Sequence, residues 1–147
     1  MRLSTKSRYG TRAILDIALQ EKTVIPLKEV AERQQISLSY LEHLITPLII
    51  GSILRSNRGR EGGISLAKPP AEIKLSEVIQ ILEGPTVTVD CVNNASVCER
   101  SKLCVTRDLW IEVNKAMEDV LQSTTIADLV ERHGKKQGNQ PPLGPQI

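Results

Sequence analysis

Aromatic residues are nearly absent from this sequence of 147 residues, which has no phenylalanine, two tyrosines and one tryptophan. Proteins that stack the bases of RNA or single strands need aromatic faces, so the composition disfavours that class and leaves duplex DNA as the better nucleic-acid partner. Long apolar runs are absent too, since no segment approaches the roughly 20 apolar residues of a membrane span. The first ten residues lack the apolar core of a secretory signal. We therefore expect a globular, cytoplasmic protein with no membrane partner.

Charge is distributed unevenly along the chain, although the net charge is only +2. Residues 1–68 contain 11 Lys/Arg and 6 Asp/Glu, a net charge of +5, whereas residues 69–147 contain 8 and 11, a net charge of −3. A basic half favours a polyanionic partner for that half alone. An ordinary solvated surface is the alternative.

Three amphipathic helices are predicted in the first fifty residues, over 4–20, from Pro26, and through the stretch "LSYLEHLITPLII". In the third, an apolar stripe follows helical spacing and is expected to pack inward. The polar residues at its start or on its outward face are Ser37, Ser39, Tyr40, Glu42 and His43. Two helices joined by a short turn predict a helix-turn-helix, with a helical hairpin inside a core as the alternative. Pro47 is expected to kink or shorten the third helix.

The next segment, "ILRSNRGREGGISLAK", predicts a strand, a glycine-rich turn and a second strand. A hairpin directly after a helix-turn-helix is the layout of a winged helix. Arg55, Arg58 and Arg60 place three guanidinium groups on this wing, where they suit phosphates or a narrow minor groove. A surface hairpin that carries arginine for solubility is the alternative.

A long helix is predicted over residues 105–123, after an amphipathic helix that ends at Gly84 and an irregular segment. Its apolar stripe is too wide for a small domain to cover, which favours a partner helix from a second subunit over packing within the chain. The stripe consists of Leu109, Trp110, Val113, Met117, Val120 and Leu121.

A last helix is expected to begin at a capping box formed by Thr125 and Asp128 and to end near His133. The chain is thus divided into a winged-helix region, a cysteine loop, dimerisation helices and a polar tail predicted to be disordered. These parts span residues 1–84, 85–104, 105–133 and 134–147. The expected fold class is mainly α with a small β-wing.

All three cysteines lie within fourteen residues, at the spacing C-x6-C-x5-C. Three thiols cannot all pair, and cytoplasmic thiol clusters usually indicate metal or redox chemistry. Structural zinc prefers closer pairs and four ligands. Iron–sulfur clusters are bound by thiolates, and basic neighbours would also activate a thiol switch. Spacing alone ranks a cluster first, a thiol switch second and zinc third.

Together these motifs resemble the IscR-type regulators of iron–sulfur cluster assembly. The resemblance rests on "MRLSTKSRYG", "AERQQISLSYLEHL", the wing "RGREGG", "LSEVI" and the cysteine loop followed by "LW". It implies a winged-helix homodimer that binds a [2Fe-2S] cluster and a pseudo-palindromic operator in double-stranded DNA. The wider family includes sensors with [4Fe-4S] clusters and cysteine-metabolism repressors without a cluster.

The resemblance assigns roles to particular residues. It implies that Cys91, Cys98 and Cys104 are the cluster's thiolate ligands and that Arg58 enters the minor groove. It implies that Glu42 discriminates between operators, as a carboxylate can accept a hydrogen bond from cytosine. The other base-facing residues of the recognition helix would be Ser37, Ser39 and Tyr40, with His43 beside them.

The sequence departs from the family at the fourth ligand. Arg107 stands where the family has a histidine, and arginine does not ligate iron. Asp108 is the nearest substitute, with a ligand from the other subunit or an open iron as alternatives. The first cysteine gap is six residues rather than five, which bears on the type of cluster. Basic residues are also missing from the end of the recognition helix, so phosphate contacts are expected from Arg2, Lys6, Arg8, Lys28 and the wing, Arg60 included.

We therefore predict a DNA-binding transcriptional regulator controlled by an iron–sulfur cluster, and not an enzyme. No catalytic histidine or phosphate-cradling loop accompanies the thiols. A cluster-free thiol-sensing regulator of the same fold is the first alternative, and a redox or metal-handling protein is the second.

Overall fold

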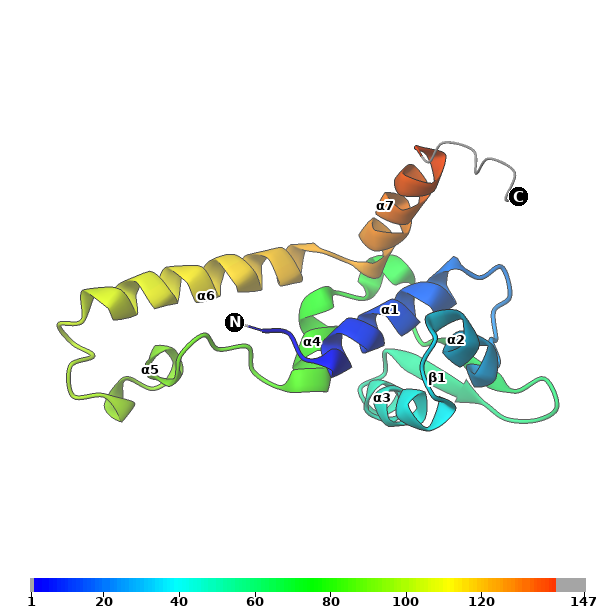
Figure 1. The fold of residues 1–147 in the computed structure, drawn as a ribbon, viewed down its shortest axis with the longest axis horizontal. Coiled ribbons are helices and arrows are strands. Elements are labelled where there is room, and N and C mark those ends of the chain that lie inside the picture. The colour runs from blue at the N-terminus through cyan, green and yellow to red at the C-terminus, as the bar shows by residue number, and fades with distance from the viewer. Residues whose placement is uncertain (1, 140–147) are drawn as a thin grey trace, which may run out of the picture.

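The computed structural model describes residues 2–139 and is mainly helical, with one two-stranded antiparallel sheet. Figure 1 shows the N-terminal elements gathered in one body, from which the long helix α6 and the segment before it project to one side. The predicted fold class is confirmed. The elements are α1 (Thr5–Leu19), α2 (Leu27–Gln34), α3 (Leu38–Ile50), β1 (Leu54–Asn57), β2 (Gly63–Leu66), η1 (Pro70–Glu72), α4 (Leu75–Glu83), α5 (Asp90–Asn93), η2 (Ala95–Val97), α6 (Val105–Ser123) and α7 (Ile126–Gly138).

Helices α1, α2 and α3 pack around one apolar core, to which the wing and α4 also contribute. Serine caps begin two of these helices: Ser4 accepts a hydrogen bond from the Ser7 amide, and Ser37 accepts one from the Tyr40 amide. Such caps satisfy amides that have no partner within the helix. Between α2 and α3, Gln35 adopts a left-handed conformation with φ of 55°, which makes the turn short.

Pro47 lies inside α3 without ending it, so the prediction of a shortened helix was wrong. The helix continues to Ile50, and the Gly51 amide donates to the Pro47 carbonyl at 2.9 Å. Leu48 follows the proline and is fully buried in the core. Packing of this last turn offsets the hydrogen bond that proline cannot donate.

An isolated β-bridge ties the wing to the segment that precedes α2. Leu54 pairs with Leu66 in the hairpin, and Ile25 exchanges two backbone hydrogen bonds of 2.8 Å with Ile64. At Gly63, a Cβ atom would overlap the Ile25 carbonyl, so only glycine permits this close approach. The wing therefore has a fixed position relative to α1 and α2.

Helix α7 returns to the body after α6 and packs against α1 and η1. Backbone hydrogen bonds from Leu75 to Thr124 and from Ile126 to Ile73 anchor this return, both at 2.9 Å. The predicted capping box of Thr125 and Asp128 is present.

The prediction that this last helix ends near His133 was wrong, because α7 continues to Gly138. An ion pair between Glu131 and Lys135, 2.7 Å apart, supports the extra turn, and basic side chains suit a helix C-terminus. Of the tail predicted to be disordered, residues 134–138 are helical and residues 140–147 lie outside the described part of the chain. No helix within residues 2–139 is long and apolar enough to span a membrane.

Replacing Thr125 with alanine is expected to destabilise the protein by about 1 kcal/mol, because the Asp128 amide loses its capping partner. Urea unfolding monitored by circular dichroism would measure the change. Ser123→Ala is the matched control, since that hydroxyl donates only to carbonyls of its own helix. Equal unfolding midpoints for the two variants would contradict a stabilising role for the cap.

Candidate nucleic-acid interface and cysteine arm

The predicted recognition face lies on α3 and is accessible. Ser37, Ser39, Glu42 and His43 are exposed, as expected for side chains that contact a partner. Tyr40 is half-buried, because its ring packs edge-on against the ring of Tyr9 with 6.1 Å between centroids. The first turn of α3 is therefore polar on its outer side and held by α1 on its inner side.

Basic side chains flank this face. Lys6 of α1 lies with Tyr40 and His43 around one shallow hollow. Lys28 of α2 is exposed, and its ion pair with Glu32 is long, at 4.0 Å, so it is worth little and leaves the lysine available. The structure thus brings Lys6 to the recognition helix, whereas Lys28 lies on the neighbouring helix.

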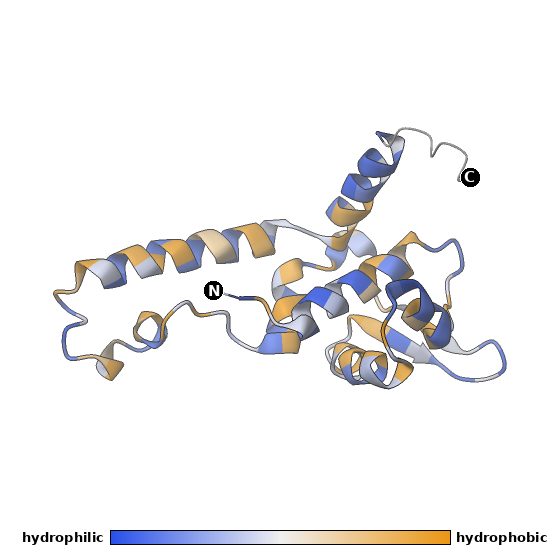
Figure 2. Cartoon of the chain, viewed as in Figure 1, coloured by the Kyte–Doolittle hydropathy of each residue, from blue (hydrophilic) through white to orange (hydrophobic). Residues whose placement is uncertain are grey.

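All three arginines of the wing are exposed, and none forms an ion pair with another described residue. The turn that carries Arg58 and Arg60 is polar (Figure 2) and includes Gly59 with a φ of 110°, a conformation that favours glycine. The wing therefore presents three exposed guanidinium groups within six residues. The wing is accordingly suited to bind a polyanion.

Residues 85–104, here called the cysteine arm, lead from the end of α4 to the start of α6. The segment predicted as irregular contains the short helices α5 and η2. Cys91 and Cys104 are half-buried, Cys98 is exposed, and all three thiols are free. Within residues 2–139, no three His, Cys, Asp or Glu side chains are close enough together to hold a metal. The arm carries the three thiols but does not bring them to one centre.

Cys104 occupies the N-cap position of α6, which is 19 residues long. Its sulfur lies 3.1 Å from the Thr106 hydroxyl. The pKa of this thiol is lowered, first by the Thr106 hydroxyl and then by the Arg107 amide, while the charge of Asp108 acts in the opposite direction. A lowered pKa favours the thiolate form of Cys104, the form that binds metals and reacts.

Arg107 braces the arm, as its Nε donates a hydrogen bond of 2.8 Å to the carbonyl of Cys91. It thus connects two of the cysteine-bearing segments without offering a metal ligand. Asp108 is exposed in the first turn of α6, one helical turn after Cys104, so the two residues share a helix face. His43 lies on α3 in the N-terminal body, away from the arm (Figure 1).

Sequence reasoning missed how the arm is attached to α6. The buried side chain of Asn114 accepts a hydrogen bond from the Thr88 amide at 3.3 Å and donates one to Glu118 at 2.7 Å. The Thr88 hydroxyl also donates to the Trp110 carbonyl at 3.4 Å. The sequence does contain a signal for this contact, because Asn114 is a polar residue within the apolar pattern of the predicted helix.

Helix α6 carries apolar residues along much of its length (Figure 2), and several of them are exposed. Of the predicted stripe, Leu121 packs against the core, while Leu109, Trp110 and Val120 are exposed. One row of apolar residues follows helical spacing and is called the α6 stripe below. It consists of Val105, Leu109, Val113, Ala116 and Val120, all of them exposed except the half-buried Val113. Isolated exposed apolar residues are common, but a continuous row of them is typical of an interface.

Comparison with known proteins identifies relatives over nearly the whole chain. Residues 3–132 match the Rrf2 family, described as iron-dependent transcriptional regulators. The protein rrf2 of Nitratidesulfovibrio vulgaris is 40% identical over 131 residues, which cover 88% of this chain and 87% of that protein.

Two solved structures resemble the fold closely. IscR of T. potens has a TM-score of 0.78 and 34% identity and covers 96% of this chain and 94% of its own. CymR, the global cysteine regulator of B. subtilis, has a TM-score of 0.77 and 34% identity and covers 90% and 98%. The predicted resemblance to IscR-type regulators is confirmed at the level of family and fold.

Proposed function

The chain belongs to the Rrf2 family of transcriptional regulators, and from this premise we propose that it is a dimeric DNA-binding regulator controlled by an iron–sulfur cluster on its cysteine arm. Its relatives are named as regulators of transcription, which confirms the prediction that it is not an enzyme. The observation that carries the proposal is the coincidence, in one chain, of an exposed recognition face, a basic wing and three free thiols on a separate arm.

Recognition of DNA is assigned to α3 and the wing. Ser37, Ser39, Tyr40 and Glu42 would face base edges in the major groove, with His43 beside them. Lys6, Lys28 and Arg60 would contact phosphates, which supply affinity without sequence information. These assignments rest on the exposure of the side chains and on the family resemblance.

Replacing Arg58 with alanine should weaken operator binding roughly tenfold, a free energy of about 1.4 kcal/mol. The loss should be greatest where the minor groove is A/T-rich and narrow, because that groove attracts arginine most strongly. Titration of labelled duplexes that differ only in the sequence of this minor-groove segment would measure the effect. Equal losses on all sequences would contradict a role for Arg58 in reading groove shape.

A homodimer is proposed to form through the α6 stripe. Except for the half-buried Val113, the stripe is exposed in a single chain, and a second copy of the same helix would cover it with matching apolar side chains. Two recognition helices about 34 Å apart would then meet successive turns of one DNA face. A pseudo-palindromic operator follows from that symmetry.

The cluster is assigned to Cys91, Cys98 and Cys104, and the chemistry of these donors fits it. Thiolates are the usual ligands of iron–sulfur clusters, and Cys104 already has a lowered pKa. Arg107 contributes a brace on the Cys91 backbone rather than a ligand, and Asp108 is the nearest candidate for a fourth ligand. When bound, a [2Fe-2S] cluster would supply a redox- and iron-sensitive link among these three residues; a [4Fe-4S] cluster is the alternative type.

Coupling to DNA binding has a short route through the structure. The arm starts directly after α4, and Glu83, the last residue of α4, accepts a hydrogen bond of 2.8 Å from the Ser4 amide at the start of α1. Tethering or releasing the arm would bias the position of α4, and with it α1 and the recognition helix. A coupling free energy of about 1–3 kcal/mol changes affinity 5–150-fold.

A cluster-free thiol-sensing regulator is the second candidate function. It is favoured by the position of Cys104 at a helix N-terminus, where a thiolate is stabilised, and by the similarity to the cysteine regulator CymR. In this case oxidation of the thiols, rather than loss of iron, would move the arm.

Anaerobic purification separates the two candidates. The cluster proposal predicts a coloured protein with visible charge-transfer absorption and stoichiometric iron and acid-labile sulfide. A colourless, iron-free protein that still binds DNA and responds to thiol oxidants would support the second candidate and refute the first. Ser96→Ala provides a control and should keep the wild-type colour and iron content, because that arm residue is exposed and, within residues 2–139, forms hydrogen bonds only with Asn94.

A further inference from the structure

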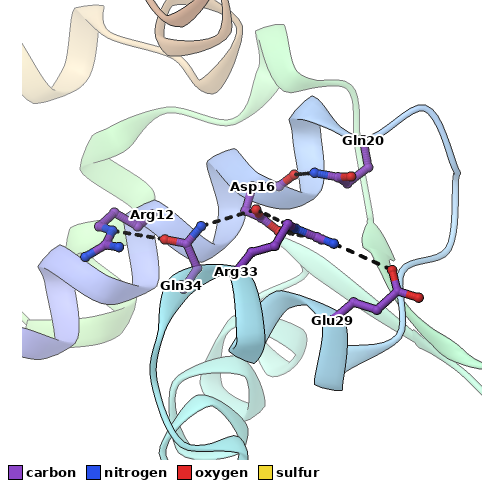
Figure 3. A network of polar contacts seen from close by, with 6 residues as sticks. All are labelled: Arg12, Asp16, Gln20, Glu29, Arg33 and Gln34. Carbon is purple, nitrogen blue, oxygen red and sulfur yellow. Dashed lines mark hydrogen bonds and ion pairs between the residues drawn. The ribbon is translucent and has the colours of Figure 1, made fainter. Parts of the chain in front are cut away.

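Asp16 organises a network of polar contacts between α1 and α2 (Figure 3). Its side chain is only 7% exposed, and its carboxylate accepts hydrogen bonds from Arg33 at 3.0 and 2.8 Å. The amide nitrogen of Gln34 donates to the same carboxylate at 3.2 Å. A buried carboxylate requires such partners, and the bidentate pair with Arg33 neutralises its charge.

The network reaches the protein surface at Arg12. Because the amide nitrogen of Gln34 is used by Asp16, its oxygen faces Arg12 and accepts a hydrogen bond of 3.0 Å from Nε. On the other side, the Arg12 guanidinium carbon lies 5.2 Å from the centroid of the Tyr9 ring. Tyr9 in turn packs edge-on against Tyr40 of the recognition helix. An exposed guanidinium is thus held in place from two sides, next to the predicted DNA-binding face.

The terminal nitrogens of Arg12 remain available. Only Nε donates a hydrogen bond to another described residue, and no carboxylate within residues 2–139 forms an ion pair with this side chain. A planar guanidinium with free donors matches the oxygens of a phosphate. Arg33, by contrast, forms ion pairs with Asp16 and Glu29, so its guanidinium group is already engaged by carboxylates.

We propose that Arg12 binds a phosphate of the DNA backbone beside the groove that α3 enters, with Gln34 and Tyr9 as its positioning residues. This inference rests on the proposed DNA-binding function and adds a contact to it. A guanidinium that is already held in place loses little side-chain entropy when it binds a phosphate. A mobile lysine on the same surface would lose more. A contact to phosphate contributes affinity and register but no base preference.

The salt dependence of DNA binding tests this proposal, because each phosphate contact contributes about 0.9 to the slope of log affinity against log salt concentration. Affinities of wild type and Arg12→Ala would be measured over a range of salt concentrations, on a selected operator duplex and on a random-sequence duplex. Arg12→Ala should make this negative slope less steep by about 0.9 for each bound subunit on both duplexes. Lys135→Ala is the control, since it removes a positive charge from α7 and should leave the slope unchanged.

Two further variants separate binding from mere packing. Arg12→Lys keeps the charge but cannot keep the same contacts with Gln34 and Tyr9, so its slope should stay at the wild-type value while its affinity falls. Gln34→Ala should behave in the same way, because it removes the support of Arg12 and not its charge.

A purely structural staple between α1 and α2 would lower thermal stability in Arg12→Ala and leave the slope as in wild type, which would overturn the proposal. If wild type binds duplex DNA and Arg12→Ala has the same salt slope as wild type, only the role of Arg12 is refuted. If wild type binds neither duplex, the proposed function fails and the role of Arg12 with it.

Discussion

Replacement of Cys104 with alanine is expected to abolish iron binding and to remove the visible absorption of the anaerobically purified protein. Two thiolates would remain, and two cannot hold a cluster that is proposed to need at least three. Cys91→Ala and Cys98→Ala should lose iron as well. Iron and sulfide analysis together with visible circular dichroism would measure the loss.

Thr106→Val is the matched control for Cys104. It removes the hydroxyl that lies 3.1 Å from the sulfur and leaves the thiol in place. The variant should keep its iron, although the pKa of Cys104 should rise toward its ordinary value because its largest stabilising contact is gone. Retention of wild-type iron content by Cys104→Ala would refute the assignment of this thiol as a ligand.

Replacement of Leu109 with aspartate is expected to convert a dimer into monomers and to weaken operator binding at least about 100-fold. Leu109 is 49% exposed in a single chain, so the substitution should leave the fold of the monomer intact. A charge in the middle of an apolar helix pair has no partner and must be desolvated. Sedimentation velocity and operator titration would measure the two effects.

Lys115→Asp is the control for this substitution. It introduces the same side chain on the same helix, outside the α6 stripe and at an exposed position. It should remain dimeric. If Leu109→Asp stays dimeric as well, the interface lies elsewhere and the α6 stripe needs another explanation.

Much of the secondary structure could be predicted because its signals are local. The apolar spacing of α3, the glycine-rich turn of the wing and the capping box at Thr125 each depend on neighbours within a few residues. The end of α7 was misplaced because an ion pair and basic residues extend the helix beyond His133. Pro47 was expected to kink or shorten α3, but the helix is not shortened, because burial of Leu48 keeps the last turn helical.

The contacts that join distant segments could not be predicted. Nothing in the spacing of the cysteines indicates that Arg107 donates to the Cys91 carbonyl, or that Asn114 anchors Thr88. The pairing of Asp16 with Arg33 likewise depends on how α1 packs against α2. Such polar contacts depend on tertiary geometry, whereas periodicity reports only which face of a helix is buried.

We propose that iron bound by the cysteine arm governs how the wing and the recognition helices bind DNA. The most direct test is to measure operator affinity anaerobically for one preparation before and after chelation removes its iron. We expect a change of at least about 5-fold in affinity or in preference between operators, and no such change in Cys104→Ala. Identical affinity and preference for the iron-loaded and iron-free protein would contradict it.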